Sequence, residues 1–328
     1  MIDRTNTVPI ALTIAGLDPS GGAGIIADIR TFAAFGCFGT AAITSLTFQN
    51  TTRVFGAVHQ TAATVRAQVT PILEDFKVSC AKTGMLPTRE IIAEVARLFR
   101  AELPAPVVDP VMRATSGDDL IDDDAVSCLV SELFPLAQLV TPNIPEAERL
   151  TGLSIRDEQT MRMAAHQIRQ MGARAVLVKG GHLAGKAAGG RGQEADGRAA
   201  TGIASTSSVP STSSTSSTPS TASTPSTSSI PSTPSTPSTS SIPSIPSIPS
   251  IRLEAIDVLD HEGTVTVFRD ELIAGGEIHG SGCTLSAAIA AGLGNGLTLE
   301  DSVQAAKRFV TEAIRRSPKL GHGARPLW

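Results

Sequence analysis

The stretch that decides the fold is ALTIAGLDPSGGAGIIADIRTF, residues 11–32. It begins with an apolar run over 11–15 that is typical of a buried strand. A glycine-rich turn follows over 16–24, and the chain continues in a pattern typical of a helix. A strand, a glycine-rich turn and a helix in this order outline a phosphate-binding loop. The stretch thus raises the question of whether its turn holds a nucleotide.

The turn matches neither common nucleotide-binding motif in full. A Walker A loop requires Lys and then Ser or Thr where this chain has Gly22 and Ala23. The dinucleotide fingerprint is matched only as Gly22-x-Gly24-x-x-Ala27, and the acidic residue expected about 20 residues later is missing. Two other interpretations stay open. One is a tight turn that lets strand and helix pack closely, and the other is a small-molecule pocket in which Asp28 hydrogen-bonds the ligand.

Apolar runs and amphipathic segments alternate along most of the chain. Strands are predicted over 10–15, 40–47, 79–83, 106–109, 139–141 and 175–179. A helix is predicted over 88–100, another begins at Leu299, and a hairpin turns at Glu262 and Gly263. This alternation predicts an α/β fold, a three-layer α/β/α sandwich with a mostly parallel central sheet.

The composition changes abruptly near residue 185. From there to about residue 253 the chain becomes rich in small residues and then in Ser, Thr, Pro and Ile, with short PST and IPS repeats. Such a segment cannot bury enough apolar surface to offset its chain entropy. We expect a single domain over residues 1–328 that is interrupted by a passive disordered insertion, with a mucin-like or partner-binding segment as the alternative.

Bulk composition excludes several classes of partner. The formal net charge of −4 and the absence of a basic block argue against nucleic acid. The cysteines form no CxxC pair, which argues against a zinc site and suits a reducing cytoplasm; they are Cys37, Cys80, Cys128 and Cys283. The chain shows neither a signal peptide nor an apolar run of about 18 residues, so we expect a cytoplasmic protein that makes no membrane contact.

A second glycine-rich stretch is HGSGCTLSAAIAAGL, residues 279–293. Gly280 and Gly282 precede a helix-like run, and the amides at a helix N-terminus can bind an anion. Cys283 would lie in the first turn, where the helix dipole lowers the pKa of a thiol. That position suits a general base or nucleophile, and the alternative is a glycine-lined helix start with a buried cysteine.

Polar residues follow the ends of several predicted strands. Asp109 in VVDPVM and Lys179 in VLVKGG lie where open α/β sheets bind ligands, although a lysine there is often only solvated. Asn143 and Glu146 in TPNIPEAERL fit a capping box at a helix start. The same pair could also hold a hydrated Mg²⁺ beside phosphates.

In content and order, these segments resemble the hydroxymethylpyrimidine/phosphomethylpyrimidine kinases of thiamine biosynthesis, which belong to the ribokinase-like superfamily. The resemblance covers nearly the whole chain except the insertion, and its further segments are GTAAITSLTFQNT, AKTGML, VVDPVMRATSGDDL, DVL and the terminal GHG. Sugar kinases of the superfamily carry an Asp base after the later turn, whereas this chain has Cys283. HGSGC replaces the commoner HGTGC, and Arg113 is unusual at the pocket rim.

The resemblance implies a ribokinase-like fold, a homodimer and an activity. ATP would phosphorylate 4-amino-5-hydroxymethyl-2-methylpyrimidine to its monophosphate and then to its diphosphate, with Mg²⁺ as cofactor. The pyrimidine would be bound by Gln49, Gly16, Asp28, Met85 and Val111. The Mg²⁺ and phosphate surroundings would be formed by Asp109, Asn143 and Glu146, and the nucleotide would be approached by Lys179 and Lys307. The anion hole and the proton acceptor would be provided by Gly280, Gly282 and Cys283.

Three other functions compete with this one. A pyridoxal or pyridoxine kinase would phosphorylate a similar hydroxymethyl heterocycle on a related fold. A non-catalytic pyrimidine-binding protein would keep the pocket without the chemistry. A cysteine hydrolase would require a histidine beside Cys283, for which His279 is the close candidate in sequence.

Overall fold

The computed structural model describes residues 8–113, 117, 119–181, 254–273 and 276–328. The insertion predicted over about 185–253 lies outside the described residues, as does part of the rim segment that follows Arg113. Within the described ranges, no helix combines the length and the apolar character that crossing a membrane requires.

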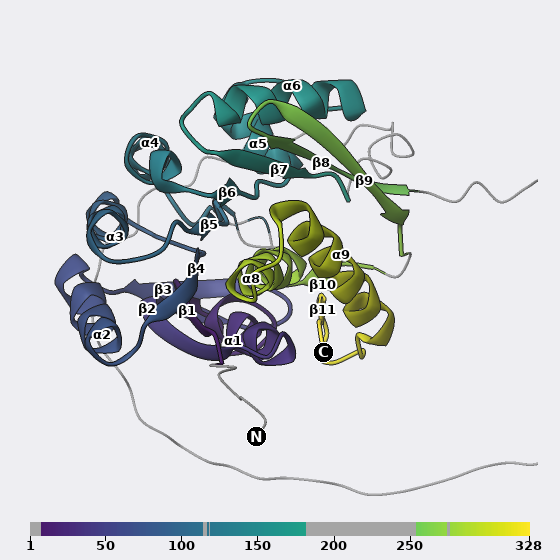
Figure 1. Ribbon diagram of the computed structural model, residues 1–328. Helices are drawn as coiled ribbons and strands as arrows, with labels where there is room; N and C mark the ends of the chain where they lie inside the picture. The colour runs from purple at the N-terminus through teal and green to yellow at the C-terminus, as the bar shows by residue number, and fades with distance from the viewer. Residues whose placement is uncertain (1–7, 114–116, 118, 182–253, 274–275) are drawn as a thin grey trace, which may run out of the picture. The chain divides into compact units, whose positions relative to one another are not determined.

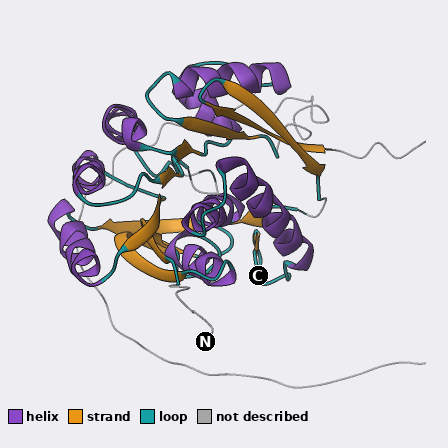
Figure 2. Cartoon of the chain, viewed as in Figure 1, coloured by secondary structure: helices purple, strands orange, loops and turns teal. Residues whose placement is uncertain are grey.

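The described strands form one large sheet and a small second one (Figures 1 and 2). The large sheet has the order β3-β2-β1-β4-β5-β6-β7-β8-β9. Its strands are β1 (Ile10–Leu17), β2 (Phe38–Gln49), β3 (Val54–His59), β4 (Val78–Thr83), β5 (Val107–Val108), β6 (Leu139–Val140), β7 (Ala175–Lys179), β8 (Glu254–His261) and β9 (Thr264–Glu271). Strands β2, β1, β4, β5, β6 and β7 are parallel, and the remaining strands are antiparallel at the two edges. The second sheet pairs β10 (Ile278–His279) with β11 (Arg325–Pro326).

Helices cover both faces of the large sheet. One face is covered by α2 (Ala62–Asp75), α3 (Arg89–Ala101), α4 (Asp123–Cys128), α5 (Ile144–Thr151) and α6 (Glu158–Arg169), with the short turns η1 (Leu129–Leu133) and η2 (Phe134–Leu136). The other face is covered by α1 (Gly24–Ala34), α8 (Ser281–Gly294) and α9 (Leu299–Arg316). Successive strand residues face opposite layers, so Val107 packs with α8 while Val108 packs in the other core.

This architecture confirms the predicted three-layer α/β/α sandwich and its mostly parallel sheet. The predicted strand over 175–179 corresponds to β7 residue for residue, and the hairpin turns at Glu262 and Gly263 between β8 and β9. Strand β3 was not predicted, because it is an edge strand whose side chains are largely exposed and therefore carry little hydrophobic periodicity.

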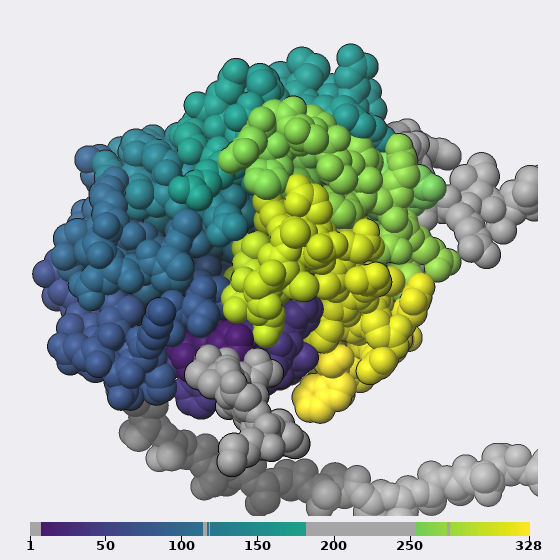
Figure 3. Space-filling model, in the orientation of Figure 1, coloured from purple at the N-terminus to yellow at the C-terminus, as the bar shows by residue number. Residues whose placement is uncertain are grey.

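The glycine-rich turn after β1 brings α1 close to the strand. Gly24 has a φ of +56°, and a Cβ there would lie 2.3 Å from the carbonyl oxygen of Gly16. Only glycine fits such a close backbone approach. Helix α1 then packs against α8, and the view in Figure 3 shows the C-terminal residues in yellow beside the N-terminal residues in purple.

Candidate active site

Polar side chains from three parallel strands meet at the carboxyl edge of the large sheet. Asp109 follows β5, Thr141 follows β6 and Lys179 ends β7. The Lys179 Nζ lies 3.0 Å from Asp109 Oδ1, and the Thr141 hydroxyl lies 3.3 Å from the same oxygen. From the opposite side, the hydroxyl of Ser286 on α8 lies 3.3 Å from Asp109 Oδ2. Asp109 is therefore the point where the sheet edge and α8 join.

The charge of Asp109 is fixed by the cations around it. Burial opposes its ionisation, but Lys179 and Lys82 outweigh burial and hold the pKa of Asp109 below its ordinary value. Burial likewise disfavours the Lys179 ammonium, and the charges of Asp109 and Glu146 raise the pKa of Lys179 above its ordinary value. The pair is therefore ionised.

Asn143 and Glu146 form the predicted capping box at the start of α5. The Asn143 N–H donates to Glu146 Oε2 at 2.8 Å, and the Glu146 N–H donates to Asn143 Oδ1 at 2.9 Å. Burial and the nearby charge of Asp109 raise the pKa of Glu146 to about 7, while Lys179 opposes this. The backbones of Asn143 and Lys179 also form an isolated parallel β-bridge, so α5 begins beside β7.

A magnesium ion fits this edge only as a partner of phosphate and water. No group of three His, Cys, Asp or Glu side chains that could hold a metal occurs among the described residues. Asp109 and Glu146 nevertheless supply buried carboxylate oxygens, which are the donors that Mg²⁺ prefers, and Mg²⁺ commonly binds through one or two carboxylates plus substrate phosphates. Asn143 Oδ1 already accepts the Glu146 N–H.

The later glycine-rich turn forms the N-terminus of α8. Gly280 is the N-cap with a φ of +81°, and a Cβ there would lie 1.9 Å from the Gly22 carbonyl oxygen. A Cβ on Gly282 would lie 3.1 Å from Lys179 Nζ and 3.8 Å from Asp109 Oδ2. Among the described residues, no side chain caps the helix. The N-terminal turn of α8 therefore lies beside the two charged groups, and its first amides have no side-chain cap among the described residues.

Cys283 lies in the first turn of α8, where a lowered thiol pKa was expected. That expectation was wrong. Burial is the largest effect on the thiol and, with the charges of Asp109 and Asp28, raises the pKa of Cys283 to about 11. Lys82 and a hydrogen bond from the Gly24 N–H act in the opposite direction. Local helix geometry did not decide the pKa because burial of the thiol, aided by the carboxylates of Asp109 and Asp28, outweighs it.

The two glycine-rich turns are joined by a hydrogen bond that the sequence did not predict. Asp18 Oδ2 lies 2.8 Å from His279 Nε2 and accepts the Ala23 N–H at 2.8 Å, while Asp18 Oδ1 accepts the Ser20 N–H at 2.8 Å. Burial opposes ionisation of Asp18, but hydrogen bonds from His279, Gln49 and Ser20 hold its pKa well below the ordinary value. The sequence signal was the acidic residue two positions before Ser20, a pattern typical of a side chain that caps its own turn.

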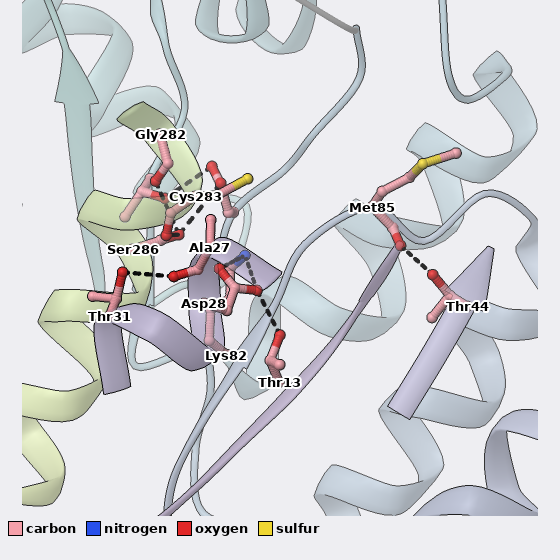
Figure 4. A network of polar contacts seen from close by, with 12 residues as sticks. Thr13, Ala27, Asp28, Thr31, Thr44, Lys82, Met85, Gly282, Cys283 and Ser286 are labelled. Atoms are coloured by element: carbon pink, nitrogen blue, oxygen red, sulfur yellow. Dashed lines mark hydrogen bonds and ion pairs between the residues drawn. The ribbon is translucent and has the colours of Figure 1, made fainter. Parts of the chain in front are cut away.

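Asp28 lies beneath the turns in a fully buried ion pair (Figure 4). Lys82 Nζ on β4 lies 3.0 and 2.9 Å from the two Asp28 oxygens, and the Thr13 hydroxyl donates to Oδ2 at 2.7 Å. All three side chains are 0% exposed. Asp28 therefore faces Lys82 and Thr13, and Lys82 was not singled out from the sequence.

The other residues expected around the pyrimidine lie near the opening turn and the end of β5. A Cβ on Gly16 would lie 3.2 Å from Met85 Sδ, so these two residues are neighbours. Gln49 is partly exposed at the end of β2 and hydrogen-bonds Asp18. Val111 is partly exposed two residues after Asp109, to whose carbonyl its N–H donates at 2.8 Å.

Lys307 is buried on α9 and pairs with Asp257 of β8. Its Nζ lies 2.5 Å from Asp257 Oδ2, and Asp257 Oδ1 accepts the Gly180 N–H at 2.9 Å. Since Gly180 directly follows Lys179, this pair fixes the backbone at the end of β7.

Fold and site define a ribokinase-like kinase. The structure of an ADP complex of Bacillus subtilis pyridoxal kinase matches with a TM-score of 0.71 and 29% identity, covering 98% of this chain and 97% of that chain. The family model described as phosphomethylpyrimidine kinase matches residues 18–232 and 249–328. This chain belongs to the phosphomethylpyrimidine kinase family, which confirms the resemblance found in the sequence.

Two curated relatives illustrate the range of this family. A hydroxymethylpyrimidine/phosphomethylpyrimidine kinase of Rhizobium meliloti (strain 1021) is 38% identical over 321 residues, which are 97% of this chain and 96% of that protein. The thiamine biosynthesis bifunctional protein ThiED of Geobacter sulfurreducens is 37% identical over 317 residues. This chain spans 51% of the length of ThiED, so it corresponds to about half of that protein.

Proposed function

We propose that this protein transfers the γ-phosphoryl group of ATP to the hydroxymethyl group of 4-amino-5-hydroxymethyl-2-methylpyrimidine. A second transfer then converts the monophosphate to the diphosphate. The observation that carries the proposal is the N-terminus of α8, where Gly282 lies beside Lys179 and Asp109 and Cys283 lies in the first turn. Family membership supports the choice of substrate.

In the first transfer, the substrate hydroxyl attacks the γ-phosphorus and the Cys283 sulfur, as thiolate, accepts its proton. Phosphoryl transfer passes through a loose transition state that needs charge stabilisation more than base strength. The amides of Gly280, Gly282 and Cys283 and the Lys179 ammonium supply that stabilisation. In the second transfer the nucleophile is already an anionic phosphate oxygen, so the demand on Cys283 is smaller.

Mg²⁺ would be held by the carboxylates of Asp109 and Glu146, with Asn143 fixing Glu146 through the capping box. When bound, it would neutralise part of the negative charge of the ATP phosphates. The ionised Asp109–Lys179 pair also contacts α8 through Ser286, so it links the sheet edge to the helix that would stabilise the transferred group.

The pyrimidine would occupy the side of the site near the opening turn. The amide of Gln49 can pair with a ring nitrogen and the exocyclic amine, while Gly16, Met85 and Val111 supply apolar or small surface. Asp28 would support this side of the site without contacting the pyrimidine, because both of its oxygens already accept hydrogen bonds from Lys82 or Thr13.

ATP would contact the end of β7. Lys179 would reach its phosphates. Lys307 acts through Asp257, which anchors the backbone after Lys179, so its role in nucleotide binding is indirect.

The test is an ATP-coupled assay with the hydroxymethylpyrimidine in which the monophosphate and diphosphate are separated. Formation of both products in sequence is the expected outcome. A protein that consumes no ATP with this substrate, yet turns over pyridoxal, overturns the proposal.

A second candidate function is phosphorylation of pyridoxal. It is favoured by the likeness to the Bacillus subtilis pyridoxal kinase over 98% of this chain. Side-by-side measurement of kcat/KM decides between the substrates. A larger value for the pyrimidine is expected, and a preference for pyridoxal would replace the first proposal with the second.

The segment over about 185–253 is proposed to be a passive insertion within one catalytic domain. Its flanking strands β7 and β8 are adjacent and antiparallel, so a chain of any length can connect them. Deleting residues 186–250 should leave kcat/KM within a few-fold, measured in the same coupled assay. Loss of activity in a protein that still folds would show that the segment is required. The homodimer and the cytoplasmic location stay predictions.

A further inference from the structure

The buried pair of Asp28 and Lys82 is unusual because it joins two full charges without solvent. Both side chains are 0% exposed, and the ammonium lies within 3.0 Å of both carboxylate oxygens. Removing two charges from water is costly, and apolar residues of similar volume often stabilise a fold equally well or better. Stability alone is therefore a weak explanation for the pair.

The pair lies in the layer that carries Cys283. Helix α1 begins at Gly24, whose N–H donates to the Cys283 thiol, and Asp28 lies about one turn further along the same helix. Figure 4 shows Lys82, Asp28 and Cys283 in one cluster around Ala27. A Cβ on Gly84 would lie 3.0 Å from Lys82 Nζ, so the backbone after β4 also encloses the ammonium.

Charged groups from four different parts of the chain act on the Cys283 thiol. Lys82 on β4 and Lys179 on β7 act as cations, while Asp28 on α1 and Asp109 after β5 act as anions. Lys82 is the largest charge effect among them and favours the thiolate. The Asp28 carboxylate itself disfavours the Cys283 thiolate, but it also holds the Lys82 ammonium in place.

We propose that Lys82, held by Asp28, is a positioning residue for Cys283 and stabilises its thiolate from beneath the site. The consequence for catalysis rests on the proposed function, in which the Cys283 sulfur accepts the proton of the substrate hydroxyl. The electrostatic part of the proposal concerns the thiol alone and can be tested without any substrate.

The test is the rate at which iodoacetamide alkylates Cys283, followed by peptide mass spectrometry between pH 7 and 10. The thiolate displaces iodide to form a carbon–sulfur bond, so below the thiol pKa the rate follows the thiolate fraction. We expect Lys82→Met to slow alkylation about tenfold at a fixed pH, because it should raise the pKa of the Cys283 thiol by about one unit. Asp28→Asn should accelerate alkylation about tenfold, because it should lower the same pKa by about one unit. A merely structural role would move both variants in the same direction.

A matched control is Arg169→Met, which removes the cation from the Arg169–Asp260 pair elsewhere in the molecule. It should leave Cys283 alkylation unchanged, and circular dichroism establishes that each variant is folded. If Lys82→Met does not fold, the double variant Asp28→Asn with Lys82→Met keeps the test open, since it should alkylate more slowly than Asp28→Asn alone.

Equal rates in the wild type and all folded variants, or changes of the same sign in both single variants, would overturn the proposal. In the coupled assay, Lys82→Met should lower kcat for the first transfer more than for the second. Altered alkylation without this split would leave the electrostatic inference intact and refute the role of Cys283 in the proposed function.

Discussion

Two glycine-rich turns with similar compositions lie against each other in this molecule and use their backbone amides differently. In the opening turn, amides are directed inward: Asp18 accepts the N–H groups of Ser20 and Ala23, and Gly24 donates to the Cys283 thiol. In the later turn, α8 starts at Gly280 with no side-chain cap among the described residues. A glycine-rich turn can bind an anion only when its amides are not already used by the protein.

The opening turn, despite its outline of a phosphate-binding loop, does not have its amides free for a nucleotide. It holds the protein's own carboxylate, whereas the later turn presents amides beside Lys179 and Asp109. Both turns need glycine for the same two reasons, because Gly24 and Gly280 each combine a positive φ with a close approach to a backbone carbonyl oxygen.

The sharpest test of the later turn is Cys283→Ala. It should lower kcat for the first transfer by about 10²–10⁴-fold, the usual contribution of a general base. The second transfer should fall much less because its nucleophile is already anionic. Rates of mono- and diphosphate formation measure both, and equal losses in the two steps would contradict the assigned role.

The turn geometry itself is tested by Gly280→Ala, in which the new Cβ would clash with the Gly22 carbonyl oxygen. Displacing the amides of α8 should lower both transfers by about 10²–10³-fold, as expected for loss of an oxyanion-hole donor. The matched control is Gly296→Ala, because Gly296 has a similar φ of +82° but nothing within 4 Å of its Cβ position. It should lower stability by about 1 kcal/mol without changing kcat.

The dependence on pH gives a smaller effect with a defined sign. Because the pKa of Cys283 is raised to about 11, at pH values below 11 the thiolate fraction rises about tenfold for each unit by which the pH increases. The kcat/KM of the first transfer should therefore rise about tenfold per unit between pH 7 and 9. A flat profile for the first transfer, parallel to that of the second, would contradict proton acceptance by Cys283.

The contact between the turns is tested by Asp18→Asn. The pKa of Asp18 is lowered in the folded protein, so its ionised form contributes stability above the unfolded pKa near 4, and this stability is lost as the pH falls through the folded pKa. The variant should be about 1.5–3 kcal/mol less stable at pH 7, with a smaller difference at pH 3. Urea unfolding measures both, with the exposed Asp75→Asn as control. A difference that grows on acidification would contradict this account.

Sequence patterns predicted the fold well where apolar runs were continuous. The run over 175–179 identified β7, and the box of Asn143 and Glu146 identified the start of α5, since both depend on neighbouring residues. Asp109 and Lys179 were found because parallel strands bring their carboxyl ends to one edge. Their direct contact across 70 positions required the structure.

The remaining site residues could not be predicted because their environment comes from distant segments. Lys82 in AKTGML has the pattern of a solvated strand end, and its burial depends on Asp28, which lies 54 positions away. The thiol pKa of Cys283 depends first on burial and then on Lys82, Asp109 and Asp28, none of which is near it in sequence. Local helix geometry gave the wrong sign for that reason.

The hydrogen bond between Asp18 and His279 joins residues that are 261 positions apart. In kinetic terms, such a contact is among the slowest to form, because the entropy of closing a long loop is lost before the contact returns free energy. We therefore expect the sandwich to collapse before its two glycine-rich turns meet. Refolding followed by enzyme activity should then lag behind refolding followed by circular dichroism. The chain would therefore regain its secondary structure before it regains catalytic activity.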